Sequence, residues 1–199
     1  MKKTGLLVYL ITALCALSLT AETITVSIGA GPHWKSKSAP QFAVWLEDED
    51  GTFVRTLYAT PKTAKKTFSF CPKSGRPESL PVWYNASKTA VHLDAVSSAT
   101  PKGGTVFQTE LDGKKYVIKA EFNTSFDYNS FYTKKNAGVN GQPSVVYAAK
   151  LSDELLNNGE IQLTLTGTGS LDGSNGHIAP DVENLTTAKE IVQAITVSR

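Results

Sequence analysis

The sequence predicts an all-β protein, an immunoglobulin-like antiparallel β-sandwich with long loops. Short segments in which apolar and polar residues alternate follow one another along the chain, and this two-residue period is the pattern of a strand with one buried face. Clusters of Gly, Asp, Asn, Ser and Pro separate the segments, as turns do. No long stretch of sequence has the period of an amphipathic helix, so two packed sheets are the expected architecture.

The first part of the chain contains one expected strand and an expected hairpin. Apolar residues occupy every second position over residues 23–28, so this segment is expected to form the first strand. Residues 41–47 place Phe42, Val44 and Leu46 on one face of an expected strand, with Ala43 and Trp45 on the other, and residues 53–59 form the returning strand after the polar turn at residues 49–51. Two such runs joined by a short turn with glycine are typical of a β-hairpin.

The middle of the chain carries further expected strands, over residues 80–84, 90–93, 106–111 and 116–122. The last two flank Asp112-Gly113-Lys114, and an Asp-Gly pair is a strong hairpin signal. We therefore expect these two strands to pair with each other. In the second of them, alternate positions carry the residues of one shared face, which are Tyr116, Ile118, Ala120 and Phe122.

The rest of the chain alternates loops and strands. Residues 123–142 are rich in Asn, Ser, Tyr, Phe and Gly, and they predict a long irregular connection. Strands are expected over residues 145–151 and 160–168, and a glycine-rich loop over residues 167–178. The pattern of residues 186–199 suits either a short helix or a closing strand.

Residues 1–21 have the pattern of a secretory signal peptide. Two lysines precede an apolar run over residues 5–17, and small and polar residues then lead to Ala21. This run is too short to span a bilayer comfortably, so we expect cleavage near Ala21. Residues 22–199 are then expected to form one exported β-sandwich domain, periplasmic or otherwise outside the cytoplasm, with no direct membrane span after cleavage.

The charge balance and the cysteine content of the chain argue against a nucleic-acid-binding protein and against a disulfide-stabilised fold. The full sequence has 20 Lys and Arg against 18 Asp and Glu, and removal of Lys2 and Lys3 with the leader leaves the two signs balanced. A near-neutral chain without a basic cluster is not typical of a nucleic-acid-binding protein. Cys71 is the one cysteine that follows the leader, so no internal disulfide is expected and the fold depends on its hydrophobic core.

The segment that says most about function is Asp-Ala-Val-Ser-Ser-Ala-Thr, at residues 94–100. Ser97, Ser98 and Ala99 are small, so they leave the hydroxyl group of Thr100 open to a close approach by another molecule. An ordinary turn between two strands has a similar composition. From these residues alone, a modified threonine and a simple turn both remain open.

The segment resembles the acceptor signature of exported flavoproteins, in which a flavin transferase joins FMN to a threonine through a phosphoester. That signature usually reads D-x-x-S-G-A-T, and this chain has Ser98 in place of the glycine. The resemblance implies that Thr100 carries covalent FMN. It also implies that Asp94 assists the transferase, by binding its metal or by orienting the threonine. The implied cofactor-binding residues are Asp94, Ser97, Ser98, Ala99 and Thr100.

Four blocks of the sequence are similar, in the same order, to a bacterial exported family catalogued as domain of unknown function 2271. These blocks are the hairpin at residues 40–57, the segment at residues 94–101, Gly-Gln-Pro-Ser-Val-Val-Tyr at residues 141–147, and Leu-Thr-Thr-Ala-Lys-Glu-Ile-Val at residues 185–192. The resemblance implies an immunoglobulin-like sandwich that serves flavin-based electron transfer outside the cytoplasm. The implied partners are a flavin transferase and a membrane-bound PepSY-type redox protein, because such proteins are often encoded beside the family.

With FMN attached, the chain is expected to be a carrier and not an enzyme. Backbone amides next to Thr100 could donate hydrogen bonds to the phosphate, and Lys102 could offset its charge. Three aromatic residues are candidates, by composition only, for the surface that supports the flavin ring: Trp45, Trp83 and Tyr84. Trp45 lies inside an alternating strand, which suits a core position equally well.

The main alternative is an unmodified periplasmic binding or structural module with no cofactor. In that case residues 94–101 form only a turn between strands. The loop that contains Phe126, Asp127 and Tyr132 is aromatic and polar, and it is expected either to bind a partner or simply to pack.

A metal-dependent hydrolase is the third and weakest interpretation. His33, His92 and His177 are scattered along the chain without the spacing of metal ligands. The acidic residues in and after the glycine-rich loop, which are Asp172, Asp181 and Glu183, lack the regular spacing of a calcium-binding loop.

Overall fold

The computed structural model describes residues 21–34, 39–60, 76–88, 101–112, 114–152 and 156–199 of the chain. The elements in chain order are β1 (Glu22–Ala30), β2 (Gln41–Glu47), β3 (Phe53–Ala59), α1 (Pro81–Ser87), β4 (Thr105–Leu111), β5 (Tyr116–Asn123), β6 (Val145–Leu151), β7 (Ile161–Gln162), β8 (Thr164–Thr168), the 3-10 helix η2 (Thr187–Glu190) and β9 (Val192–Ser198).

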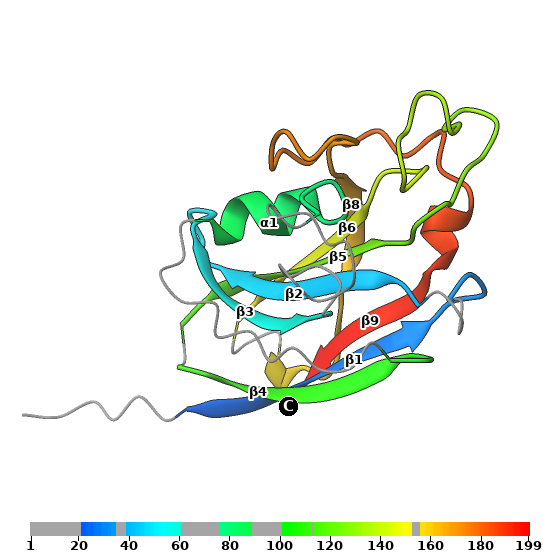
Figure 1. The fold of residues 1–199 in the computed structure, drawn as a ribbon. Coiled ribbons are helices and arrows are strands. Elements are labelled where there is room, and N and C mark those ends of the chain that lie inside the picture. The colour runs from blue at the N-terminus through cyan, green and yellow to red at the C-terminus, as the bar shows by residue number, and fades with distance from the viewer. Residues whose placement is uncertain (1–20, 35–38, 61–75, 89–100, 113, 153–155) are drawn as a thin grey trace, which may run out of the picture.

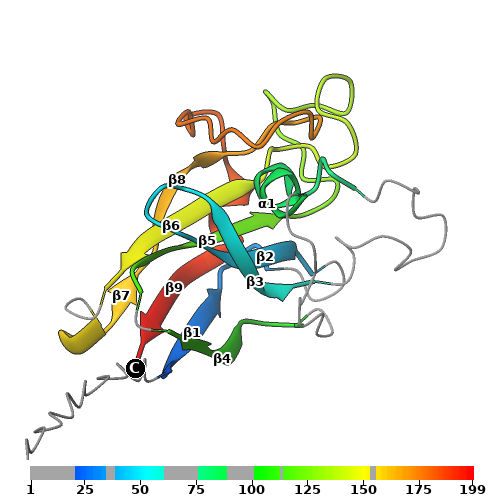
Figure 2. The same ribbon diagram turned by 90° about the vertical axis from the view of Figure 1, so that its left-hand side faces the viewer.

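Within the described residues these strands form two antiparallel sheets that pack face to face (Figure 1, Figure 2). One sheet has four strands in the order β4-β1-β9-β7, and the other has five in the order β3-β2-β5-β6-β8. In the first sheet β1 pairs with both β4 and β9, so that Val26 lies opposite Phe107 on one side and Val197 on the other. The expected all-β antiparallel sandwich is confirmed.

The main core fills the space between the two sheets. The rings of Phe42 on β2 and Phe122 on β5 stack with their centroids 5.1 Å apart. Tyr58 on β3 stacks on Phe42 at 5.0 Å. Trp34, from the turn that follows β1, lies 5.8 Å from Phe42 at the edge of this cluster. Stacked aromatic rings bury large apolar areas and gain some additional attraction from their geometry.

The five-stranded sheet is buried on its outer face as well. Trp45 on β2 and Val146 on β6 point away from the other sheet and pack with Trp83 of α1 in a second apolar cluster. Figure 1 shows α1 lying across this face of the sheet. As a result β2 is buried along its whole length, which explains why its sequence is apolar on both faces.

The strand expected over residues 80–84 is wrong, because α1 occupies this part of the chain. Pro81 lies in the first turn of the helix, where the fixed φ of proline is favourable and its missing N–H has no partner to lose. A short apolar run does not distinguish a buried strand from a buried helix. The strand expected over residues 90–93 lies outside the described residues.

The hairpin expected from residues 106–111 and 116–122 is also wrong, although both segments are strands. β4 pairs with β1 in the four-stranded sheet, whereas β5 pairs with β2 and β6 in the five-stranded sheet. The connection between β4 and β5 therefore crosses from one sheet to the other. The shared face expected on β5 is confirmed, since all four of its residues are buried.

The last third of the chain follows the expected pattern with one subdivision. The strand expected over residues 160–168 is divided into β7, which pairs with β9, and β8, which pairs with β6. Both alternatives for residues 186–199 are partly correct, because η2 precedes the closing strand β9. Residues 123–142 form the long irregular connection between β5 and β6 that the sequence predicts.

The stacked aromatic core predicts a large loss of stability in Phe122→Ala. Phe122 is fully buried, and truncation of such a side chain to alanine costs about 3–5 kcal/mol, since the cavity refills only in part. Urea denaturation measures this change. The control is Val106→Ala on β4, where the side chain is 65% exposed, and a change within about 0.5 kcal/mol is expected. Equal losses in the two variants would contradict this description of the core.

Candidate functional site

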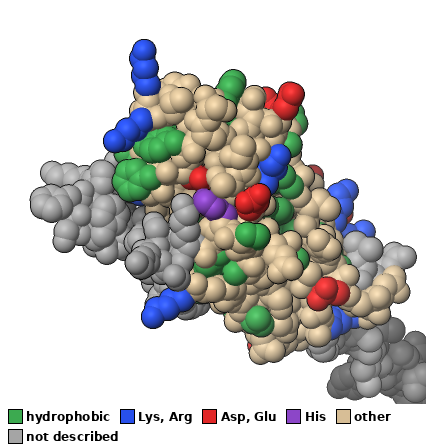
Figure 3. All heavy atoms as spheres, turned by 90° about the vertical axis from the view of Figure 1, so that its right-hand side faces the viewer, with side chains coloured by type: hydrophobic (Ala, Val, Ile, Leu, Met, Phe, Trp, Pro, Cys, Tyr) green, Lys and Arg blue, Asp and Glu red, His purple; other side chains and the backbone are tan. Residues whose placement is uncertain are grey.

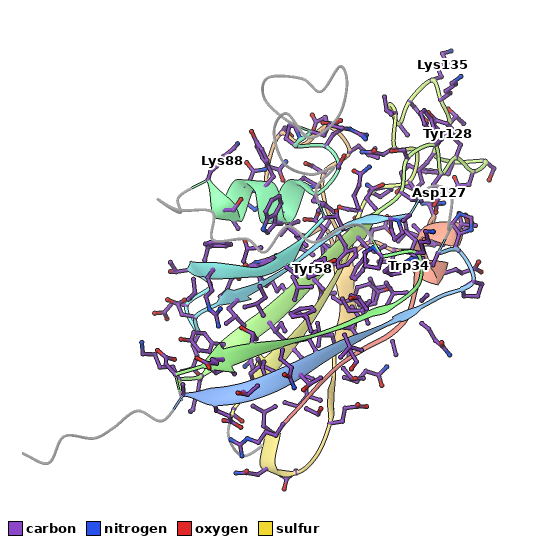
Figure 4. All side chains as sticks on the ribbon, turned by 60° about the horizontal axis from the view of Figure 1, so that its bottom comes forward. Trp34, Tyr58, Lys88, Asp127, Tyr128 and Lys135 are labelled. Carbon is purple, nitrogen blue, oxygen red and sulfur yellow. The ribbon has the colours of Figure 1, made fainter. Side chains whose placement is uncertain are left out.

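Several of the longest described loops meet at one end of the sandwich. The connection after β1, the β5–β6 connection and η2 come together there, and Figure 4 shows Trp34 and Asp127 close to one another at this end. Loops at the end of a β-sandwich are a common place for binding groups.

The predicted acceptor segment lies outside the described residues. Asp94, Ser97, Ser98, Ala99 and Thr100 fall within residues 89–100, so the structure does not place any of them. The preceding element is α1, on the outer face of the five-stranded sheet, and the following element is β4, at the edge of the four-stranded sheet. The described elements before and after this segment thus belong to different layers of the molecule.

The residues that follow the segment are fixed against the body of the protein. The indole Nε1 of Trp34 donates a hydrogen bond to the carbonyl oxygen of Pro101, at 3.3 Å. Gly104 lies so close to β1 that a Cβ atom there would be 2.2 Å from the carbonyl oxygen of Ile28. Between these anchors, Lys102 and Gly103 are exposed.

A buried polar cluster lies beside this anchor. Asp127 is 5% exposed, and its Oδ1 accepts a hydrogen bond from the hydroxyl of Thr187 at 2.6 Å. Nε2 of His33 lies 3.3 Å from the same oxygen but without the alignment of a hydrogen bond. Within the described part of the chain, both this nitrogen and Oδ2 of Asp127 are buried without a hydrogen-bond partner. A charged imidazolium would make the contact an ion pair.

Gln142 joins the cluster to η2. Its Nε2 donates to the hydroxyl of Thr187 at 2.7 Å, and its Oε1 accepts from the backbone N–H of Thr186 at 2.6 Å. Gln142 belongs to the sequence block at residues 141–147, and the two threonines belong to the block at residues 185–192. Two blocks that are far apart in the sequence therefore meet through one buried amide side chain.

Sequence analysis did not identify this cluster. His33 follows β1, Asp127 and Gln142 lie at the two ends of the β5–β6 connection, and Thr187 begins η2, so no local spacing in the sequence relates them. The one signal in the sequence is that Gln142 and Thr187 each lie in a block that resembles the family, at residues 141–147 and 185–192.

A second buried polar site holds α1 against the five-stranded sheet. Glu121 is fully buried on β5. Its two carboxylate oxygens accept hydrogen bonds from the backbone N–H groups of Val82 at 3.2 Å and Trp83 at 2.8 Å, and from the hydroxyl of Ser144 at 2.6 Å. Burial raises the pKa of Glu121 to about 7, because the charged form loses its hydration, while the hydrogen bonds from Ser144, Trp83 and Val82 act in the opposite direction.

Two of the three aromatic residues suggested by composition are buried and provide no exposed surface for a flavin ring. Trp45 is fully buried, and its Nε1 donates to Glu47 at 2.8 Å, which in turn pairs with Lys119 at 2.6 Å. Trp83 is 5% exposed and belongs to the cluster beneath α1. Tyr84 is partly exposed, with Nζ of a neighbouring lysine over its ring. Trp45 and Trp83 are thus core residues.

The acidic residues considered for calcium bond to nearby backbone instead. Asp172 accepts from the N–H of Ser174, and Asp181 accepts from the N–H of Glu183. In the described ranges, no three His, Cys, Asp or Glu side chains are grouped so as to hold a metal ion. His92 lies outside those ranges.

The fold and the arrangement of its loops define the class of protein: an all-β sandwich with one buried polar cluster at a loop-rich end and another beneath α1. Residues 23–124 match the family DUF2271, described as a predicted periplasmic protein. The chain belongs to this family, and the expected export to the periplasm is confirmed. No curated protein and no solved structure matches the chain. Among the helices of the described residues, none has the length and apolar character needed to cross a bilayer.

The environment of Glu121 predicts a pH-dependent stability. The folded protein binds the Glu121 proton more tightly than the unfolded chain, in which the ordinary pKa is 4.5. The favourable contribution of this proton is complete below that value and is lost as the pH rises through about 7. We expect a fall in the free energy of unfolding on the order of 3 kcal/mol over this interval.

Urea denaturation at a series of pH values measures this fall, and Glu121→Gln removes the titrating group. The variant should lack the part of the pH dependence that Glu121 contributes. Glu110→Gln, at an exposed position on β4, is the control and should retain the wild-type pH dependence. An identical slope in wild type and Glu121→Gln would contradict the prediction.

Proposed function

We propose that this periplasmic protein is a flavin-linked redox accessory protein that carries FMN covalently on Thr100. The observation that carries the proposal is the segment at residues 94–100, which reads as an acceptor signature within a chain of this family. The proposed role is extracytoplasmic electron transfer. The proposed partners are a flavin transferase, which attaches the cofactor, and a membrane-bound PepSY-type redox protein, which exchanges electrons with it.

In this proposal the transferase takes the FMN group from a flavin dinucleotide: the hydroxyl oxygen of Thr100 forms the phosphoester, the pyrophosphate bond breaks, and a nucleoside monophosphate and the threonine proton leave. The described residues that follow Thr100 suit a covalent attachment, because Pro101 and Gly104 are held against the body while Lys102 is exposed. The ammonium group of Lys102 offsets the negative charge of a phosphate nearby. A cofactor attached at a fixed point of the chain can move only within reach of that point. It is not enclosed by the protein.

The flavin supplies the electron-transfer chemistry, and the protein supplies position and surroundings. Trp45 and Trp83 are buried, so they leave no ring face for the isoalloxazine. A flavin that this sandwich does not enclose is accessible to a partner protein, which suits a carrier better than an enzyme. We therefore propose that the chain itself catalyses no reaction.

The second candidate function is an unmodified periplasmic binding or structural module. Ser98, at the position that is glycine in the acceptor signature, is the observation that favours it. Glycine allows a positive φ or a close backbone approach that serine does not easily allow. The two candidates differ in one measurable property, which is the presence of a covalent flavin.

Mass spectrometry of the exported protein tests the proposal. The chain is produced in an exporting host together with a flavin transferase, and the intact mass is measured. We expect a gain of one FMN less one water, and Thr100→Ala should lack it. Ser98→Gly restores the signature and should retain the gain. An unmodified mass in wild type and in Ser98→Gly, while the transferase modifies a known acceptor protein in the same host, would exclude the carrier function.

The anchor at Pro101 predicts a role for Trp34 in presenting the acceptor. Trp34→Phe keeps an aromatic ring in the core but removes the indole N–H that donates to Pro101. We expect a smaller modified fraction than in wild type at equal expression, because Thr100 is then less well positioned for the transferase. Near-wild-type urea stability of this variant would separate the effect from unfolding, and an unchanged modified fraction would show that the hydrogen bond has no part in presentation.

A further inference from the structure

The β5–β6 loop, residues 124–144, exposes large apolar side chains. Phe126 is 65% exposed, Phe131 is 54% exposed and Val139 is 49% exposed. These three make up half of the exposed large hydrophobic side chains within the described ranges. Single exposed apolar residues are ordinary on a protein surface, but several in one loop point to an interaction site.

The backbone holds Phe126 in an unfavourable conformation. Its φ is 65°, in the left-handed region, which a bulky residue other than glycine rarely adopts. Hydrogen bonds on either side fix this geometry: the N–H of Phe126 donates to Val139 at 2.9 Å, and the N–H of Asp127 donates to Asn140 at 2.8 Å. Backbone strain that the surroundings impose is frequent at functional sites. Here it accompanies an aromatic side chain in solvent.

The outer part of the loop is fixed in a similar way. Oδ1 of Asn129 accepts hydrogen bonds from the N–H groups of Phe131 at 2.9 Å and Tyr132 at 2.7 Å. Nδ2 of Asn129 donates to the carbonyl oxygen of Asn184, at 2.9 Å, which ties the loop to the body. Nδ2 of Asn136 donates to the carbonyl oxygen of Phe131 at 2.9 Å. The second exposed phenylalanine is therefore also presented by an ordered backbone.

The exposed charge of the loop is positive. Lys134 and Lys135 are exposed, whereas Asp127, the one acidic residue in the loop, is buried and bonded to Thr187. Figure 4 places Lys135 at the outer tip, and Figure 3 shows basic side chains next to exposed apolar ones at this end of the molecule. Burial raises the pKa of Tyr132 in the loop, and the charge of the exposed Asp181 adds to this rise.

We propose that the β5–β6 loop binds the surface of a bilayer that contains anionic phospholipids. Phe126 and Phe131 enter the interfacial region, and Lys134 and Lys135 contact the lipid phosphates. Figure 1 shows the loop extending beyond the ends of β5 and β6. A protruding tip with aromatic and basic side chains fits a deformable lipid surface, which accepts both groups at once. A protein partner would instead need a pocket complementary to two separate rings.

This inference does not depend on the proposed flavin. It assigns to the loop a role in bringing a periplasmic sandwich to the membrane surface. The Thr100→Ala variant should bind lipid as wild type does. Loss of flavin attachment and loss of membrane binding are therefore separate outcomes.

Vesicle sedimentation tests the proposal. The protein is purified from the periplasm and mixed at low salt with vesicles of phosphatidylcholine alone or of phosphatidylcholine with phosphatidylglycerol. We expect binding to the vesicles with phosphatidylglycerol and weaker binding as salt is added, because salt screens the lysines. Absence of binding to these vesicles would overturn the proposal, and a protein would then be the better candidate for the partner of the loop.

Paired variants identify the surface that binds. Phe126→Ser with Phe131→Ser should abolish binding. Lys134→Gln with Lys135→Gln should weaken it by roughly five-fold for each lysine removed, which corresponds to about 1 kcal/mol per basic residue near an anionic surface. The matched controls lie elsewhere on the molecule and should bind as wild type does: Val106→Ser, and Lys114→Gln with Lys115→Gln.

All of these positions are exposed, so the variants should keep the fold, and circular dichroism with urea denaturation checks it. Wild-type binding by the two phenylalanine substitutions together would overturn the proposal. So would an equal loss of binding in the controls.

Discussion

The apolar outer face of the five-stranded sheet is the constraint that organises this fold. Trp45 and Val146 need a cover, and α1 supplies it with Trp83. The same contact brings the first turn of the helix over Glu121, a carboxylate that burial would otherwise leave without partners. Two helix N–H groups and the hydroxyl of Ser144 satisfy it. The side chain of Glu121 thereby binds N–H groups in the first turn of the short helix α1, and it also fixes α1 on the sheet.

The loop-rich end depends on a different polar network. Asp127 and Gln142 bind the hydroxyl and backbone groups of η2, which leads directly into β9. The long β5–β6 connection is therefore fixed to the last strand of the four-stranded sheet, although its own strands belong to the other sheet. Rigid presentation of exposed groups requires a support of this kind, because a loop of this length would otherwise lose much entropy on binding.

Most strands could be predicted from the sequence, because alternation records which face of a strand is buried. β2, β3 and β6 begin and end at the expected residues. The pairing of strands was less predictable. The Asp-Gly pair after β4 predicts only a local reversal of the chain. It does not indicate which sheet the next strand joins. Residues 80–84 are apolar, and such a run suits a buried strand and a buried helix equally. Their packing against Trp45 is what favours the helix. The His33–Asp127 cluster joins two separate loops, and no local pattern predicts contacts at that separation.

The pairing of β1 with β9 has a consequence for the way the protein matures. A chain that crosses a membrane in order delivers β1 early and β9 last, yet these strands are neighbours in one sheet. Until β9 arrives, β1 has an unpaired edge that can pair with another copy, and contacts of such long sequence separation form slowly. The four-stranded sheet is thus completed only once β9 has reached the periplasm.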